Sequence, residues 1–258
     1  MTDILVIPDP HATPSHDNNR FTALGRFIID RRPDIVVCLG DFADLPSIST
    51  HNSVEAAEGL RYSNDINAAY DAMNRLLEPI QVFNEGQRNN KKATYRPELH
   101  MLGGNHEQRI DTLCSAYPHL RQVISLDDLP YSGWRYTPFK HSLEIGGIHF
   151  SHYFTSGVMG RPISGVNISR SLLTKLHVSS VQGHSHLYSH AEETLPNGKK
   201  IFGLSAGCFS HPDYKEWWCR DTEFRWWRGV ILLNDIDGDG YYDHLEAITQ
   251  RKLMRDYQ

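Results

Sequence analysis

The chain has 258 residues, 40% of them hydrophobic and 22% charged, and a formal net charge of −5 at pH 7. This length and composition suit one α/β domain, which we expect over residues 1–258, and the negative charge argues against a general attraction to polyanions. The four cysteines have no C-x-x-C spacing, which suits reduced thiols in the cytoplasm. The acidic N-terminus is too short for a signal peptide, and no apolar run approaches the ~20 residues of a membrane span. We therefore expect a soluble, cytoplasmic protein without membrane contact.

The first part of the chain alternates apolar strands with a helix. Residues 4–7 and 35–39 are continuous apolar runs that predict buried strands. Between them, Phe21, Leu24 and Phe27 lie on one face of a predicted helix. Two such strands joined by a helix predict a parallel β-α-β unit.

The segment of about 47–97 interrupts this alternation, and we expect it to be a helical insertion with a basic loop. Apolar residues at helical spacing from Ile66 to Ile80 predict one amphipathic helix, in which Pro79 marks a kink or the end. Residues 87–92 are basic and polar. A solvated loop is the simpler interpretation, and a patch that faces the substrate is the alternative.

A third strand, over residues 98–102, leads into the turn Gly104-Asn105-His106-Glu107. Parallel strands present their carboxyl ends at one edge of a sheet, where the sites of α/β folds form. Asp9, Asp41 and Asn105 each follow such a strand, so we expect them at one shared edge. Downstream, the chain changes to shorter strands with turns, and two sheets packed in one domain is the simplest architecture.

Side chains suited to metal binding follow five of the apolar strands. They are Asp9 and His11 in D-P-H, Asp41 and Asp44 in G-D-F-A-D, Asn105 and His106 in G-N-H-E, His152, and His184 and His186 in G-H-S-H. Each cluster alone is more typical of a turn than of a ligand pair. Their ordered recurrence after strands is not expected by chance and favours a metal site.

This ordered set resembles the motifs of the calcineurin-like metallophosphoesterase superfamily over residues 4–186. The resemblance implies a four-layer αββα sandwich of two mixed sheets flanked by helices. It also implies a two-metal site. In this site Asp9, His11 and His186 would hold the first ion, and Asn105, His152 and His184 would hold the second. Asp41 would bridge the two ions. His149 is an alternative to His152, but only His152 follows a strand end.

Two divalent ions that share a carboxylate and a water lower the pKa of that water until hydroxide is available near neutral pH. The mixed nitrogen and oxygen ligands suit Mn²⁺, with Fe or Zn²⁺ as alternatives, better than Ca²⁺. The resemblance gives His106 the role of stabilising or protonating the leaving oxygen, while Asp44 orients its ring.

The family's protein phosphatases follow the second Asp of G-D-x-x-D with Arg-Gly, whereas this chain has Leu45-Pro46. An arginine that could clamp a phosphomonoester is therefore missing at that place. The remaining candidates for substrate contacts are Arg20, Arg109, Arg161 and His211.

A second metal motif occurs near the C-terminus. Asp235, Asp237, Asp239 and Gly240, with Glu246 in the twelfth position, match the EF-hand calcium loop. The apolar run before it predicts a strand rather than the helix that an EF-hand needs, and D-G-D-G is typical of a hairpin turn, so we favour a turn over calcium binding.

These features predict a two-metal phosphoester hydrolase, and we favour a phosphodiesterase that acts on a nucleotide or a nucleic-acid end. The aromatic and basic segment 214–228 either packs over the sheet or a second subunit, or stacks a nucleobase. The alternatives are a DNA nuclease, a phosphomonoesterase, and a non-catalytic metal-binding scaffold on the same fold. The sequence does not predict the oligomeric state.

Overall fold

The computed structural model describes residues 2–50, 58–216, 219 and 222–258. The α-helices are α1 (Asn19–Arg31), α3 (Tyr62–Asn89), α4 (Gln108–Ala116), α5 (Ile168–Leu176) and α6 (Gln250–Tyr257). The 3-10 helices are η1 (Pro46–Ile48), η2 (Pro118–Gln122), η3 (Leu126–Asp128) and η4 (Glu223–Arg225). The strands are β1 (Thr2–Ile7), β2 (Ile35–Cys38), β3 (Glu98–Leu102), β4 (Arg135–Thr137), β5 (Leu143–Ile145), β6 (Ile148–Ser151), β7 (Thr155–Ser156), β8 (Arg161–Pro162), β9 (Ser180–Gln182), β10 (Tyr188–Thr194), β11 (Lys200–Ala206), β12 (Gly229–Ile236) and β13 (His244–Thr249).

A six-stranded sheet has the order β13-β12-β1-β2-β3-β4. Strands β1 to β4 are parallel to one another, whereas β12 runs antiparallel to both β1 and β13. Residues 4–7 of β1 are buried, as expected for a parallel strand that is covered on both faces. The predicted strands at residues 4–7, 35–39 and 98–102 and the predicted β-α-β unit are confirmed.

A five-stranded sheet has the order β10-β11-β9-β6-β5. Its central strands β11, β9 and β6 are parallel, and the outer strands β10 and β5 each pair antiparallel with their neighbours. Both sheets are therefore mixed.

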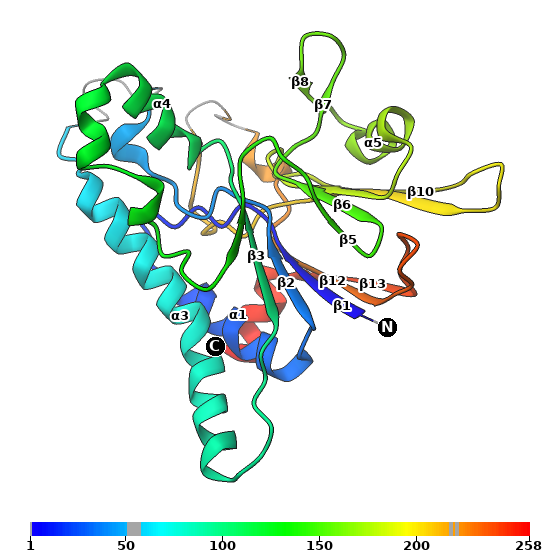
Figure 1. Cartoon of the computed structure of the whole chain (residues 1–258), viewed down its shortest axis with the longest axis horizontal. Coiled ribbons are helices and arrows are strands. Elements are labelled where there is room, and N and C mark those ends of the chain that lie inside the picture. The colour runs from blue at the N-terminus through cyan, green and yellow to red at the C-terminus, as the bar shows by residue number, and fades with distance from the viewer. Residues whose placement is uncertain (1, 51–57, 217–218, 220–221) are drawn as a thin grey trace.

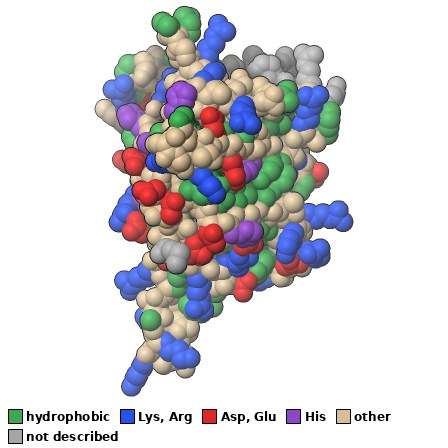
Figure 2. Space-filling model, turned by 90° about the vertical axis from the view of Figure 1, so that its right-hand side faces the viewer, with side chains coloured by type: hydrophobic (Ala, Val, Ile, Leu, Met, Phe, Trp, Pro, Cys, Tyr) green, Lys and Arg blue, Asp and Glu red, His purple; other side chains and the backbone are tan. Residues whose placement is uncertain are grey.

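The two sheets face each other and helices cover their outer faces (Figure 1). Helices α1, α3 and α6 pack on the six-stranded sheet, and α5 packs on the five-stranded sheet. Between the sheets, apolar side chains such as Val6, Val37, Phe150 and Phe202 form one continuous core. Figure 2, which views the molecule from the right-hand side of Figure 1, shows hydrophobic side chains gathered on this face with charged side chains around them. The predicted αββα sandwich is confirmed.

Helix α3 connects β2 to β3 and packs along α1 on the same face of the sheet. Pro79 lies inside this helix, which continues to Asn89, so the expectation that Pro79 could end it was wrong. The two helices pack closely here, because a Cβ atom on Gly25 of α1 would lie 2.4 Å from the carbonyl oxygen of Leu76 and 2.9 Å from Cγ of Pro79. The end of α3 and the basic loop 87–92 lie away from the carboxyl ends of the strands (Figure 1), which argues against a substrate-facing patch there.

The acidic segment 235–246 joins β12 to β13. Oδ1 of Asp237 accepts hydrogen bonds from the backbone N–H of Asp239 (2.8 Å) and of Tyr241 (3.0 Å), which closes the turn. The Glu246 carboxylate lies on β13 and pairs with Arg31 of α1. Strands flank the turn on both sides, and these contacts support the turn interpretation rather than an EF-hand.

Candidate metal centre

The carboxyl ends of five strands bring the predicted ligands together. Strands β1, β2 and β3 of one sheet and β6 and β9 of the other all end at this edge, and the ligands that follow them are Asp9, His11, Asp41, Asn105, His152, His184 and His186. Parallel neighbours share a direction, so each sheet delivers its residues to one place. The site therefore lies where the two sheets meet at this edge.

One group of facing ligand atoms consists of Asp9, His11 and His186, whose nitrogen and oxygen atoms all lie within 4.8 Å of one another. Nε2 of His11 and Nε2 of His186 are 3.0 Å apart, and Nε2 of His186 lies 3.4 Å from Oδ2 of Asp9. All three residues are buried.

A second group consists of Asp41, His152 and His184, with Asn105 beside it. Nε2 of His152 lies 3.3 Å from Oδ2 of Asp41 and 2.8 Å from Oδ1 of Asn105. On the other side of the ring, Nδ1 of His152 is 3.0 Å from the carbonyl oxygen of Leu39. A proton on Nδ1 would leave the Nε2 lone pair facing two oxygens, which is an arrangement that a cation satisfies.

The chemistry of both groups fits divalent ions. Imidazole nitrogens with carboxylate and amide oxygens are the ligands that transition metals use in hydrolases. Oδ1 of Asp9 is buried and has no hydrogen-bond partner among the described residues, although buried polar atoms normally have one. A metal ion would satisfy this oxygen.

Two glycines allow the carboxylates to approach the turns. A Cβ atom on Gly104 would lie 2.1 Å from Oδ1 of Asp41, and one on Gly183 would lie 2.2 Å from Oδ1 of Asp9. Both distances are shorter than any real contact. The glycines in G-N-H-E and G-H-S-H are therefore required by the close approach of the two acidic side chains.

The backbone at the site is strained. Asp9, His11, Asp41, His184 and His186 have φ angles of 37°, 46°, 49°, 64° and 58°, in the left-handed region that L-residues rarely adopt. Such conformations cost about 1–3 kcal/mol each and concentrate at functional sites. The surrounding sheets hold these turns in place.

His106 is buried and belongs to a third group of facing ligand-type atoms, together with His11, Asp44 and Glu216. Its Nδ1 is 3.0 Å from Oδ1 of Asp44 and 2.8 Å from the carbonyl oxygen of Asp44, and its Nε2 is 3.7 Å from Oδ2 of Asp41. Burial alone would lower the pKa of His106, but Asp41, Asp44 and Glu216 raise the pKa well above its usual value. These carboxylates favour the protonated imidazole, and the guanidinium of Arg109 opposes them.

Glu107 organises the turn from which His106 projects. Its buried carboxylate accepts hydrogen bonds from the backbone N–H groups of Asp41 (3.0 Å), Phe42 (2.9 Å) and Gly104 (2.8 Å). These bonds fasten the turn after β2 to the turn after β3. Sequence reasoning did not single out this residue, although it is the last position of G-N-H-E.

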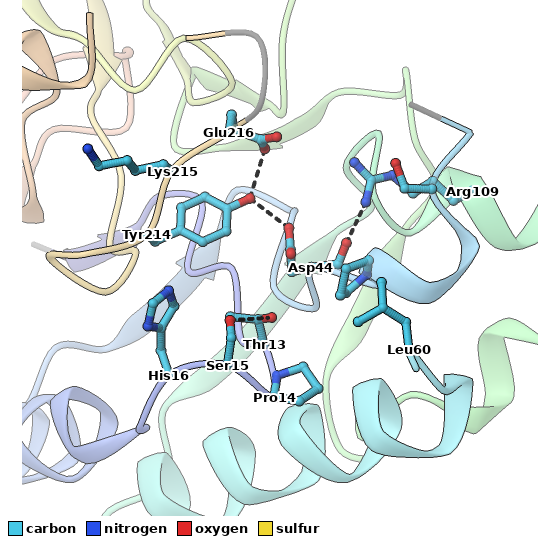
Figure 3. Close-up of a pocket in the computed structure, with 12 residues that line it drawn as sticks. Thr13, Pro14, Ser15, His16, Asp44, Leu60, Arg109, Tyr214, Lys215 and Glu216 are labelled. Carbon is cyan, nitrogen blue, oxygen red and sulfur yellow. Dashed lines mark hydrogen bonds between the residues drawn. The ribbon is translucent and has the colours of Figure 1, made fainter. Parts of the chain in front are cut away.

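A cavity of about 350 Å³ lies next to side chains that contact the buried His106, although His106 is not part of its lining (Figure 3). Its lining includes Asp44, Arg109, Tyr214 and Glu216. Nη1 of Arg109 donates a hydrogen bond to the carbonyl oxygen of Asp44 (2.7 Å), and Nη2 lies 3.1 Å from Nε2 of His106. A ligand in this cavity would meet the guanidinium of Arg109 and the carboxylate of Glu216, and both of these groups contact Nε2 of His106.

A family model described as calcineurin-like phosphoesterase matches residues 2–227. The chain belongs to the calcineurin-like phosphoesterase family. It is a metal-dependent phosphoester hydrolase whose ligand clusters suit divalent ions. Among the helices of the described residues, none is long and apolar enough to cross a membrane.

Two solved structures are similar to this phosphoesterase. Yfce, a phosphoesterase from E. coli, is 13% identical with a TM-score of 0.38, and the match covers 96% of this chain and 100% of that chain. A conserved uncharacterized protein from Streptococcus pneumoniae TIGR4, a predicted phosphoesterase, is 13% identical with a TM-score of 0.34, and the match covers 96% of this chain and 97% of that one. A search of curated proteins finds no match.

Burial and charge set the protonation of the ligands in this phosphoesterase. Burial raises the pKa of Asp9 to about 7, although His152 opposes the shift. Burial would also raise the pKa of Asp41, but His106 and His152 hold it well below its usual value. Burial lowers the pKa of His184 to about 4, which leaves its ring neutral. Metals bind neutral imidazoles and ionised carboxylates, so Asp41 and His184 are in the form that binds metal, whereas Asp9 and His152 would have to lose protons.

Of the four predicted substrate contacts, only Arg109 lines the cavity. Arg20 was expected there, but it is buried and donates hydrogen bonds to the carbonyl oxygens of Phe209, Pro10 and Asp17, which makes it structural. Arg161 is exposed on β8, outside the cavity lining. His211 stacks on His16, which lines the cavity, with ring centroids 4.5 Å apart. His211 itself is not part of the cavity lining.

The aromatic segment 214–228 supplies residues that sequence reasoning missed. The ring of Tyr214 stacks on His11 with centroids 4.7 Å apart, and the ring of Trp226 meets His186 edge-on at 4.3 Å. Tyr214 and Trp226 therefore pack over two of the predicted ligands, while residues 217, 218, 220 and 221 of the segment lie outside the described residues. No motif or strand end marks Tyr214 or Glu216 in the sequence, and the density of aromatic residues was the one available signal.

Proposed function

We propose that this phosphoesterase cleaves a phosphodiester of a nucleotide or of a nucleic-acid end with two divalent cations, Mn²⁺ in preference to Fe or Zn²⁺. The observation that carries the proposal is the pair of buried ligand groups beside His106, next to a cavity with an arginine. Asp9, His11 and His186 would hold one ion, Asn105, His152 and His184 the other, and Asp41 both. Asp41 acts electrostatically on Asp9, which supports its place between the groups.

When bound, two such ions supply a hydroxide nucleophile near neutral pH and positive charge for the phosphoryl oxygens. Asp9 and Asp41 are the only charged members of the ligand set, so most of the positive charge of the ions would remain available. Asn105 contributes a neutral oxygen where an aspartate would cancel part of that charge.

His106 would protonate the leaving oxygen. Asp44 holds the ring through Nδ1, which leaves Nε2 toward Glu216 and Arg109, two side chains that line the cavity. Arg109, whose guanidinium reaches the same nitrogen, would orient a phosphoryl oxygen beside it.

A second cavity supports a diester rather than a monoester. A space of about 400 Å³ is lined by residues that include Asn105, Arg109, Leu113 and Tyr117. Arg109 lines both cavities, which supports a phosphate position beside this residue with space on either side of it. A phosphodiester carries two organic groups, and each would have its own space.

The test is hydrolysis of bis(p-nitrophenyl) phosphate beside p-nitrophenyl phosphate with Mn²⁺, followed by a panel of cyclic nucleotides, dinucleotides, capped nucleotides and DNA ends. We expect metal-dependent cleavage of the diester with higher kcat/KM than the monoester. Absence of Mn²⁺-dependent cleavage of every ester would contradict the proposal, and preference for the monoester would contradict its diester part.

A further inference from the structure

The carboxylate of Glu216, which lines the cavity, contacts Nε2 of the buried His106. Oε1 of Glu216 is 3.2 Å from Nε2 of His106, and the side chain of Glu216 is only 9% exposed. The leaving oxygen of a substrate would have to approach this same nitrogen if His106 is the proton donor. Glu216 therefore places a negative charge at the edge of the proposed phosphate position.

We propose that Glu216 is a specificity-determining residue that makes the site discriminate against dianionic phosphomonoesters and favour monoanionic phosphodiesters. This inference rests on the proposed function, because it assigns a charge preference to that same site. Discrimination arises here from repulsion of the wrong substrate rather than from added attraction of the right one.

Tyr214 holds the carboxylate in this position. Its hydroxyl lies 2.8 Å from Oε1 of Glu216 and 2.7 Å from Oδ1 of Asp44. The hydroxyl therefore links the carboxylate of Glu216 to that of Asp44, which orients His106. Figure 3 shows Glu216 and Asp44 joined through this hydroxyl, with Lys215 on the other side of the ring. Lys215 pairs with Glu223, so the neighbouring cation has its own carboxylate partner.

The charges around the cavity make an additional negative charge costly. Glu216 and Asp44 are both carboxylates at the cavity, and the cations that line it are Arg109 and Lys215, of which Lys215 is paired with Glu223. At neutral pH a phosphodiester carries one negative charge, whereas a monoester carries between about 1.5 and 2. The additional charge of the monoester faces Glu216 in a partly buried site, where water screens it weakly. We expect this repulsion to weaken monoester binding by about tenfold or more.

The experiment uses Glu216→Gln, which removes the charge and keeps the shape, with Asp213→Asn as the matched control. Asp213 lies on the same segment but its side chain is 84% exposed, so the control removes an equal charge outside the cavity. Binding of inorganic phosphate and of dimethyl phosphate to the Mn²⁺-loaded proteins is measured by calorimetry, beside kcat/KM for the monoester and the diester.

In Glu216→Gln we expect phosphate to bind about tenfold tighter while dimethyl phosphate changes less than about threefold, and the diester-to-monoester ratio of kcat/KM to fall about tenfold. Asp213→Asn should change neither ratio. Equal shifts in both variants, or unchanged ratios in Glu216→Gln, would overturn the inference. Loss of Mn²⁺ from Glu216→Gln would overturn it too, because Glu216 would then be a metal ligand together with His11, Asp44 and His106, the residues it is grouped with.

These readouts separate the inference from the proposed function. A wild-type protein that cleaves the diester but shows no effect of Glu216→Gln leaves the function in place and removes the role of Glu216. A wild-type protein that cleaves neither ester removes the function, whereas the phosphate and dimethyl phosphate affinities still decide the charge preference of the site.

Discussion

Oδ1 of Asp44 lies 3.0 Å from Nδ1 of His106, and this contact fixes which nitrogen of the ring faces the cavity. Asp44 also accepts a hydrogen bond from the hydroxyl of Tyr214 at 2.7 Å. The imidazole thus has its inner nitrogen held by a carboxylate and its outer nitrogen turned toward the substrate. Asp44 thus orients the ring of the proposed general acid, while Asp41 accepts a hydrogen bond from the backbone N–H of His106 (2.8 Å).

Replacement of His106 by alanine should lower kcat for the diester by about 10²- to 10⁴-fold, because proton donation to the leaving oxygen is lost. Asp44→Asn should give a smaller loss, about 10- to 100-fold, because the ring remains but is held less well. Metal content, measured by mass spectrometry, should stay the same in His106→Ala. Full activity in His106→Ala would exclude this residue from the mechanism.

Asp41→Asn should lower the occupancy of both metal ions, because the proposed bridge loses its charge. Two dications with a neutral amide between them repel one another more strongly, and activity should fall by at least about 100-fold. The control is His149→Ala, which removes the histidine three residues before His152, on β6. A variant Asp41→Asn that retains two ions per chain would show that Asp41 is not the bridge.

Gly104→Ala should destabilise the fold by about 1–3 kcal/mol and weaken metal binding, because its Cβ atom would lie 2.1 Å from Oδ1 of Asp41. Gly86→Ala is the matched control, since no atom lies within 4 Å of the added Cβ on helix α3. That change should stabilise the helix by about 0.5–1 kcal/mol. Urea unfolding of the two variants gives both free energies, and a Gly104→Ala protein as stable as the wild type would contradict the close approach.

Metal affinity should rise with pH. Burial raises the pKa of Asp9 to about 7, and Asp41 raises the pKa of His152 to about 9 despite burial, so both ligands hold protons that a metal must displace. Protons compete less as the pH increases from 6 to 8, and Mn²⁺ should bind at least about tenfold tighter at pH 8. Calorimetry in buffers of different ionisation enthalpy should also detect proton release on binding. Affinity independent of pH would contradict these protonation states.

The two arginines near the site should behave differently. Arg109→Ala should raise KM about tenfold or more and leave the melting temperature nearly unchanged, because its guanidinium faces the cavity. Arg20→Ala should lower the free energy of unfolding by about 1–3 kcal/mol, because three backbone carbonyls lose their donor. Thermal unfolding beside steady-state kinetics separates the two effects, and a KM effect without destabilisation in Arg20→Ala would reverse the assignment.

Much of the architecture followed from local patterns. Continuous apolar runs such as residues 4–7 and 35–39 are typical of central parallel strands, which are buried on both faces. Strands β1 and β2 were therefore predictable. Helix α6 was missed, because Leu253 is its one fully buried apolar side chain among mainly charged neighbours. Its position depends on contacts with α1 that no local pattern records.

The sequence by itself determined the chemistry of the site, because ligand-type residues recur in a specific order after strands, and strand direction alone places them at one edge. Only the tertiary structure decided what surrounds that site. Arg20 and Arg109 are the same residue type, yet one is buried against carbonyl oxygens and the other faces the cavity. Glu216 reaches His106 across a separation of 110 residues because the chain returns over the sheet edge, and such long-range contacts leave no periodic signal in the sequence.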